Sequence, residues 1–158
     1  MKIPVAATLT EWLHFLHLLA AMIWVGGAAT LSALSIQVLR SGERDAVARF
    51  VRSVRVIGPL VLAPATAAVA GFGIWLVIDS DSWNFGQAWV WLGLALLAAA
   101  FLIGAVFQSQ AMIRAQRASE AGDGAEAARD LRRWSWGILV ILLLLLVATW
   151  DMVFKPGY

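Results

Sequence analysis

The stretch Trp134–Phe154, WSWGILVILLLLLVATWDMVF, decides the fold class of this chain. Its centre, Ile141–Val147, contains only bulky apolar side chains. A helix needs about 20 mostly apolar residues to cross the hydrocarbon core of a bilayer. Because this stretch has that length and composition, we expect it to form a membrane-spanning helix.

Three stretches upstream have the same character, so the predicted spans cover about residues 12–39, 56–78, 88–107 and 134–154. Backbone groups in lipid must be satisfied within the structure, and long continuous apolar runs do not suit barrel strands. The first run is far longer than the core of a signal peptide, and we expect it to remain in the mature protein. The sequence therefore predicts one transmembrane domain, residues 1–158, folded as an all-α integral membrane four-helix up-down bundle.

The composition supports the same class. Of the 158 residues, 61% are hydrophobic and 14% are charged, whereas a soluble domain has about 45–50% apolar and about 25% charged residues. A soluble domain of this size could not bury so much apolar surface, and disorder needs the opposite composition. The absence of cysteine excludes disulfides, zinc–cysteine sites and catalytic thiols.

Basic residues are confined almost entirely to two connections between spans. The loop 79–87 has none, and we expect the segment 41–55 to be helical, either at the headgroups or in line with the second span. Because basic loops stay in the cytoplasm, we expect both termini and the 79–87 loop to face outward. Ten of the 12 Lys and Arg residues lie in the two basic connections: Arg40, Arg44, Arg49, Arg52 and Arg55, and Arg114, Arg117, Arg129, Arg132 and Arg133.

Small residues indicate where the helices pack closely. Ala63, Ala67 and Gly71 repeat every four residues in the second span, and Ala100 and Gly104 have the same spacing in the third. Close approach at small residues favours helix association in lipid, so these positions are predicted contact faces. We expect the bulky fourth span to be the most exposed to lipid.

Ionisable side chains within the spans are few and lie toward one end. The first span carries Glu11, His14 and His17, and the fourth ends with Asp151. Buried ionisable groups in a span are costly and face the interior. We therefore expect one stripe of the first span, repeating at three and four residues, to face the bundle: Thr10, His14, His17, Ala21, Trp24, Ala28, Leu31 and Ser35.

Four interpretations of the histidine pair remain open. In the first, each imidazole only bonds a backbone carbonyl, a tryptophan or Asp151 across the bundle. In the second, His14 and His17 bind copper or zinc, and Asp151 or Met152 adds a ligand. In the third they hold haem, with a methionine, a water or a histidine of a second copy as the other axial ligand. In the fourth, Glu11, both histidines and Asp151 relay protons.

No motif for catalysis accompanies these residues. The glycines in 71–73 are too close together for a phosphate-binding loop, and Ser32 and Ser35 have no general base on their helix. Serines inside a helix ordinarily bond the backbone. The sequence favours a protein without catalytic residues, whose partner is the lipid bilayer and not nucleic acid.

Two blocks carry a family resemblance. The first is EWLHFLHLLAAMIWVGG, residues 11–27, in which His17 and Trp-Val-Gly-Gly are separated by six residues; the second is WNFGQAWVWLG, residues 83–93. Together with GFGIW at 71–75 and the four spans, they resemble the bacterial predicted integral membrane family known as domain of unknown function 2269, over the chain up to about Phe107. This resemblance implies a multi-pass protein of the bacterial inner membrane.

The first block is also similar to the copper-resistance D family and to the four-helix protoporphyrinogen oxidases of bacteria, with His17 in the place of their shared histidine. The oxidases imply a functional lysine in a later helix, where this chain has only Lys2 and Lys155, and copper-resistance D proteins are generally longer. We expect a haem- or metal-associated membrane protein centred on His17. The alternative is a non-catalytic structural or accessory bundle, such as a homodimer, in which the histidines only make interhelical hydrogen bonds.

Overall fold

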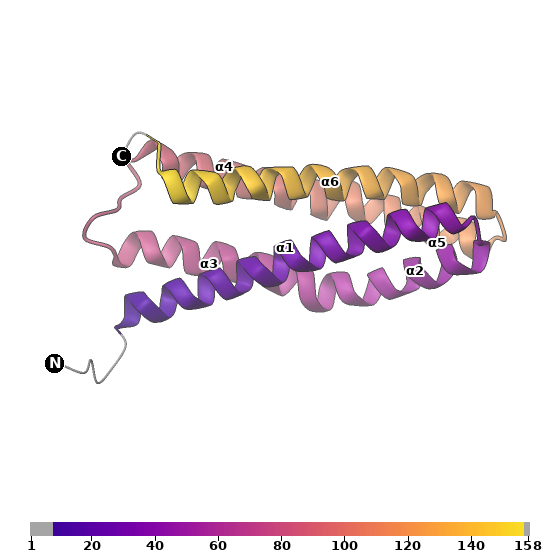
Figure 1. Ribbon diagram of the computed structural model, residues 1–158, viewed down its shortest axis with the longest axis horizontal. Helices are drawn as coiled ribbons and strands as arrows, with labels where there is room; N and C mark the ends of the chain where they lie inside the picture. Colours follow the sequence, from indigo (N-terminus) through magenta and orange to yellow (C-terminus); the bar gives the residue numbers. More distant parts are fainter. Residues whose placement is uncertain (1–7, 157–158) are drawn as a thin grey trace.

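The computed structural model describes residues 8–156, which form helices joined by short turns (Figure 1). Helix α1, Leu9–Ser41, is the first of four rods. The second rod consists of α2, Arg44–Ile57, the π-helical turn η1, Gly58–Leu62, and α3, Ala63–Asp79. The third consists of α4, Ala88–Leu102, the π-helical turn η2, Ile103–Gln108, and α5, Ser109–Glu120. The fourth is α6, Gly124–Phe154.

Within the described residues, these four rods are long and apolar enough to cross a membrane. The predicted all-α membrane bundle is therefore confirmed. The basic segment 41–55 falls largely in α2, which continues through η1 into the second span instead of lying apart from it.

Turn chemistry fixes where the rods begin and end. At the start of α1, the backbone N–H of Glu11 donates to the Thr8 hydroxyl, and the N–H of Thr8 donates to the Glu11 carboxylate. This capping box satisfies two backbone donors that the helix leaves free. Gly42 and Gly122 follow α1 and α5 with φ angles of 70° and 79°, a left-handed conformation that costs residues with a Cβ roughly 1–2 kcal/mol.

Successive rods run antiparallel, so the bundle has two different ends (Figure 1). The turns after α1 and α5 lie at one end, which we call the arginine-rich end. The loop 80–87, the start of α1 and the end of α6 lie at the other, which we call the tryptophan-rich end. Lys2, expected on the outward side, lies outside the described residues. Helix α1 packs closely against α3 and α6, and α6 also packs against α4 and α5, whereas α3 and α4 are not a closely packed pair.

Three apolar clusters fill the bundle from one end to the other. The largest lies at the arginine-rich end and includes Val51, Leu131 and Trp134. The middle cluster includes Trp24, Val69 and Leu145. The outer cluster, at the tryptophan-rich end, consists of Val77, Trp89 and Val90 with Trp83 and Leu94 against them.

Two packing predictions are wrong. The fourth span is not the most exposed, because 28% of its apolar stretch is buried against 11% for the third. Bulky apolar side chains suit lipid and core equally, so apolarity alone does not separate the two faces. Ala63, Ala67 and Gly71 are exposed, and α3 packs instead through Ala65 and Val69.

Candidate functional site

His17 is buried between α1 and α3, with 8% of its surface exposed. Its Nδ1 lies 3.0 Å from the backbone carbonyl oxygen of Val69. Because a carbonyl only accepts, Nδ1 must carry the proton, and in the neutral ring Nε2 keeps a lone pair. Gly73 makes room for the ring, since a Cβ there would lie 3.0 Å from Cε1 and 3.3 Å from Nδ1 of His17. The fold therefore fixes which nitrogen of His17 is available to a ligand.

Asp151 of α6 is fully buried, and neither of its carboxyl oxygens has a hydrogen-bond partner among the described residues. Helix α4 places Gly93 opposite, where an added Cβ would lie 3.4 Å from Oδ2 of Asp151 and 3.8 Å from Cε of Met152. Buried polar groups nearly always have a partner, and an exception points to strain or to a functional role. Asp151 is such an exception inside a membrane span.

The two side chains occupy one level of the bundle. On α3, Gly73 lies between Val69 of the middle cluster and Val77 of the outer cluster. On α4, Gly93 lies in the same way between Leu97 and Val90. Because His17 meets the glycine of α3 and Asp151 meets that of α4, all four rods contribute to this level. We call His17, Gly73, Gly93 and Asp151 the polar layer.

His14 lies beyond this layer, toward the tryptophan-rich end, and is half-buried. Its Nδ1 lies 3.0 Å from the carbonyl oxygen of Thr10 in its own helix, and its ring meets Trp83 edge-on at 5.4 Å between centroids. Trp83 also packs against Trp89, and the ammonium of Lys155 lies 4.1 Å from the centre of the Trp83 ring. These side chains cover the polar layer from outside, and we call His14, Trp83, Trp89 and Lys155 the aromatic cover.

The structure brings some predicted ligands together and separates others. Asp151 and Met152 approach the same glycine of α4, whereas His17 lies against α3 and His14 belongs to the aromatic cover. Across residues 8–156, no three His, Asp or Glu side chains form a group that could hold a metal ion, and no ion pair joins His17 to Asp151. Glu11 is exposed and bonded within the capping box.

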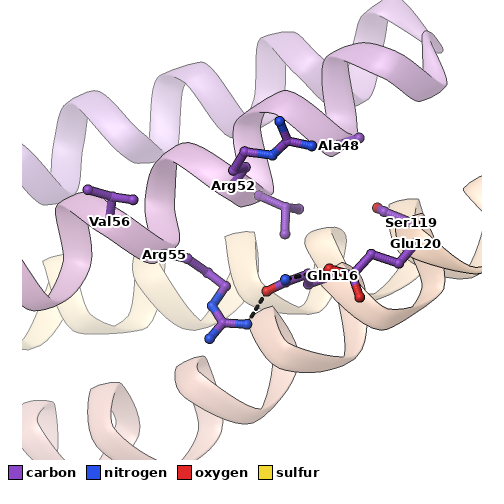
Figure 2. Close-up of a pocket in the computed structure, with 8 residues that line it drawn as sticks. Ala48, Arg52, Arg55, Val56, Gln116, Ser119 and Glu120 are labelled. Atoms are coloured by element: carbon purple, nitrogen blue, oxygen red, sulfur yellow. Dashed lines mark hydrogen bonds between the residues drawn. The ribbon is translucent and has the colours of Figure 1, made fainter.

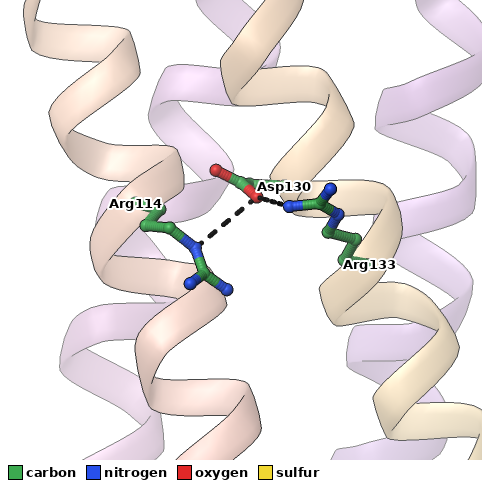
Figure 3. A network of polar contacts seen from close by, with 3 residues as sticks. All are labelled: Arg114, Asp130 and Arg133. Atoms are coloured by element: carbon green, nitrogen blue, oxygen red, sulfur yellow. Dashed lines mark hydrogen bonds and ion pairs between the residues drawn. The ribbon is translucent and has the colours of Figure 1, made fainter.

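Sequence reasoning missed three buried polar residues, Gln108, Asp130 and Ser135, of which the first two lie in unusual surroundings. Gln108 ends η2 with 7% of its surface exposed, and its Oε1 has no partner in the described part of the chain. Asp130 of α6 lies between two guanidinium groups, with Oδ1 at 3.7 Å from Nε of Arg114 and at 3.2 Å from Nη1 of Arg133 (Figure 3). The three-residue spacing of Asp130 and Arg133 was visible in the sequence, but the approach of Arg114 required the tertiary fold.

Comparison with known proteins gives a family. No curated protein and no solved structure matches the chain. A sequence profile described as "Predicted integral membrane protein (DUF2269)" matches residues 11–156, a range that contains the polar layer, the aromatic cover and both arginine-rich turns. Since the match extends over nearly the whole sequence, the chain belongs to the DUF2269 family of predicted integral membrane proteins.

Proposed function

We propose that the protein binds a metal ion at the polar layer, with Nε2 of His17 as the first ligand atom. The observation that carries this proposal is the hydrogen bond from His17 Nδ1 to the carbonyl of Val69. Metal-binding histidines almost always donate their other ring N–H to a carbonyl, a carboxylate or a water, which fixes the tautomer and the ring orientation. In this chain the acceptor is a backbone oxygen of the neighbouring helix, so the ring is held by the α1–α3 interface.

Asp151 is the second candidate ligand. A carboxylate inside a span is costly unless a proton or a cation compensates it, and its oxygens have no partner among the described residues. The thioether of Met152, beside the same glycine, would add a soft donor. An imidazole combined with a carboxylate or a thioether suits copper or zinc. Water would complete the coordination of such an ion.

A metal ion fits this layer better than haem does. A single added carbon at Gly73 would crowd the His17 ring, and apolar clusters close the layer on both sides. A porphyrin would have to displace those side chains. His14 could not supply the opposite axial ligand, since it lies three residues away on the same helix and against the aromatic cover.

The second candidate is a structural or accessory bundle, alone or as a homodimer. The hydrogen bond from His17 to Val69 favours it too, because polar bonds between helices hold bundles together in lipid. His14 does not follow that pattern, since it bonds its own helix. A purely structural role leaves the unpartnered carboxyl of Asp151 without a purpose, and this places the candidate second.

The test is purification in detergent from cells supplied with copper, zinc and haem, followed by metal analysis and an absorption spectrum. We expect stoichiometric copper or zinc in the wild type, loss of the metal in His17→Ala, and retention in His14→Ala as the matched control. Metal retained in His17→Ala, or none in the wild type, would contradict the proposal. A Soret band that disappears in His17→Ala would show that the bound group is haem and not a metal ion.

We also propose that the arginine-rich end faces the cytoplasm of a bacterial inner membrane, with both termini outside. The gathering of arginines at one end supports this orientation. Because the chain has no cysteine, a single cysteine at Asn84, in the loop 80–87, reports its side without ambiguity. We expect an impermeant maleimide to label it from outside, and labelling only from the cytoplasm would overturn the orientation.

A further inference from the structure

Two cavities lie along the seam between the second and third rods. The first, of about 410 Å³, lies between α2 and α5 and is lined by side chains that include Arg52, Arg55, Gln116, Ser119 and Glu120 (Figure 2). The second, of about 440 Å³, lies farther from the arginine-rich end, between η1 and η2. Arg55 lines both cavities, so they adjoin at this residue, and we call the two together the seam groove.

The two parts of the seam groove differ in polarity. In the first part, its head, Arg55 of α2 points toward Gln116 of α5, and Arg52, Ser119 and Glu120 also belong to the lining (Figure 2). The walls of the second part, its body, are mostly apolar and include Trp24, Phe101, Gly104, Met112 and Ile113. Residues of both π-helical turns line the body, and such turns are frequent at functional sites. A groove with a charged head and an apolar body matches the polarity of a lipid molecule.

The head of the groove carries an excess of positive charge. Arg55 donates to the amide oxygen of Gln116 and not to a carboxylate, and Gln116 Nε2 donates to Glu120 at 2.6 Å. Within residues 8–156, neither Arg52 nor Arg55 forms an ion pair. Two arginines therefore outweigh the one carboxylate that lines the head, which favours an anion there.

Gln108 adds a polar residue to the mostly apolar lining of the body. Its side chain lines the groove, lies against Gly137 of α6, and has a buried oxygen without a partner among the described residues. Gln108 precedes Gln116 of the head by eight residues, which places it about 12 Å along the rod from the head. The unpaired Oε1 faces Gly137, which does not line the groove, so an acyl chain in the body would leave this oxygen without a partner.

We propose that the seam groove binds an anionic phospholipid, with its phosphate at Arg52 and Arg55 and an acyl chain in the body between η1 and η2. The apolar body alone would accept any chain from the bilayer, whereas the arginines select a negative headgroup. The lipid would occupy the side of the bundle on which α3 and α4 do not pack closely. The groove involves none of the residues of the polar layer, so the two proposals are tested independently.

Native mass spectrometry of the detergent-purified chain tests the head, with dioleoylphosphatidylglycerol and dioleoylphosphatidylcholine as probes. We expect tighter binding of the phosphatidylglycerol, and Arg55→Gln should weaken it about fivefold, the effect of one basic residue near a membrane surface. Arg49→Gln is the matched control, because Arg49 is an exposed arginine of the same helix outside the groove. Arg52→Gln provides a second variant if Arg55→Gln does not fold.

Gly104→Leu tests the body. A Cβ at Gly104 meets no heavy atom nearer than Cδ1 of Ile141 at 4.0 Å, so leucine can enter the groove and should lower binding of the phosphatidylglycerol. Gly71→Leu, at an exposed position outside the groove, should leave it unchanged. Four results would overturn the proposal: equal binding of both lipids, equal losses in Arg49→Gln and Arg55→Gln, full binding by Gly104→Leu, or displacement of the lipid by inorganic phosphate, which would indicate a site for a free anion.

Discussion

Asp130 and Asp151 lie on the same helix, and we expect their replacement by alanine to change stability in opposite directions. Asp130 lies between the guanidinium groups of Arg114 and Arg133, whereas Asp151 has no hydrogen-bond partner among the described residues. Both substitutions gain similar helix propensity, roughly 0.5–0.7 kcal/mol. Propensity therefore cancels only from the difference between the two variants, which the environment of each carboxyl group decides.

At Asp151, alanine removes a buried polar group without a hydrogen bond, and such a group costs about 1–3 kcal/mol. The volume lost is small, since a cavity of roughly 20–30 Å³ costs about 0.5–0.7 kcal/mol. Asp151→Ala should thus raise the free energy of unfolding of the metal-free protein by about 1–2 kcal/mol. At Asp130 the arginine side chains are 48% and 58% exposed, so water can solvate them and the loss should be about 1–2 kcal/mol.

Thermal unfolding in detergent measures both effects, with the fluorescence of the nine tryptophans as the signal and a chelator to remove metal. A chain of this length shifts its midpoint by about 2–4 °C per kcal/mol. We expect Asp151→Ala to unfold a few degrees above the wild type and Asp130→Ala a few degrees below it. Added copper or zinc should then raise the midpoint of the wild type but not that of Asp151→Ala, because only a protein that binds the ion is stabilised by it.

The reasoning would be refuted if metal-free Asp151→Ala unfolded below the wild type by as much as Asp130→Ala. That result would mean that the carboxyl group of Asp151 has a stabilising partner in the folded protein. If added metal raised the midpoints of the wild type and of Asp151→Ala equally, Asp151 would not be a ligand of the metal ion.

Two further substitutions test the interfaces around the polar residues. Gly73→Val should lower the metal content of the purified protein, since its Cβ would lie 3.0 Å from Cε1 of His17. Gly71→Val, on the exposed face of the same helix, should leave the metal content unchanged. Equal metal loss in both variants would argue against the site. Ser135→Ala removes the buried hydrogen bond of 2.9 Å to Ser35, and we expect the free energy of unfolding to fall by about 1 kcal/mol. An unchanged midpoint for Ser135→Ala would show that this bond between α1 and α6 contributes nothing net.

The spans could be predicted because a bilayer requires a fixed length of apolar helix, which hydropathy detects directly. The buried face of α1 could be predicted as well, since His17, Trp24 and Ser35 of the expected stripe are all buried. A stripe that contains ionisable residues has only one favourable orientation in lipid, toward the interior. On α3 the corresponding argument failed, because small residues such as Ala63 and Ala65 lie on both faces and give no contrast.

The partners of the site residues could not be predicted in the same way. The acceptor of His17 Nδ1 is a backbone carbonyl, which every residue carries and which no sequence pattern marks. Of the two π-helical turns, only η1 has a signal in the sequence. Turn η1 contains Pro59, and proline disturbs helical hydrogen bonding, but η2 contains no proline, and nothing in its sequence sets it apart.

Three interior polar side chains each lie against a glycine of a facing helix, and none of the three bonds another side chain among the described residues. A glycine costs a helix about 0.5–1 kcal/mol relative to alanine, and a helix that only had to pack could carry alanine at all three positions. The pairs are His17 with Gly73, Asp151 with Gly93, and Gln108 with Gly137, where an added Cβ would lie 2.7 Å from Oε1 of Gln108. The buried polar residues that do have side-chain partners, Ser35, Asp130 and Ser135, lie toward the arginine-rich end. The glycines therefore make room for the polar side chains themselves. In the polar layer, this placement leaves Nε2 of His17 and the carboxyl oxygens of Asp151 for the metal ion that we propose.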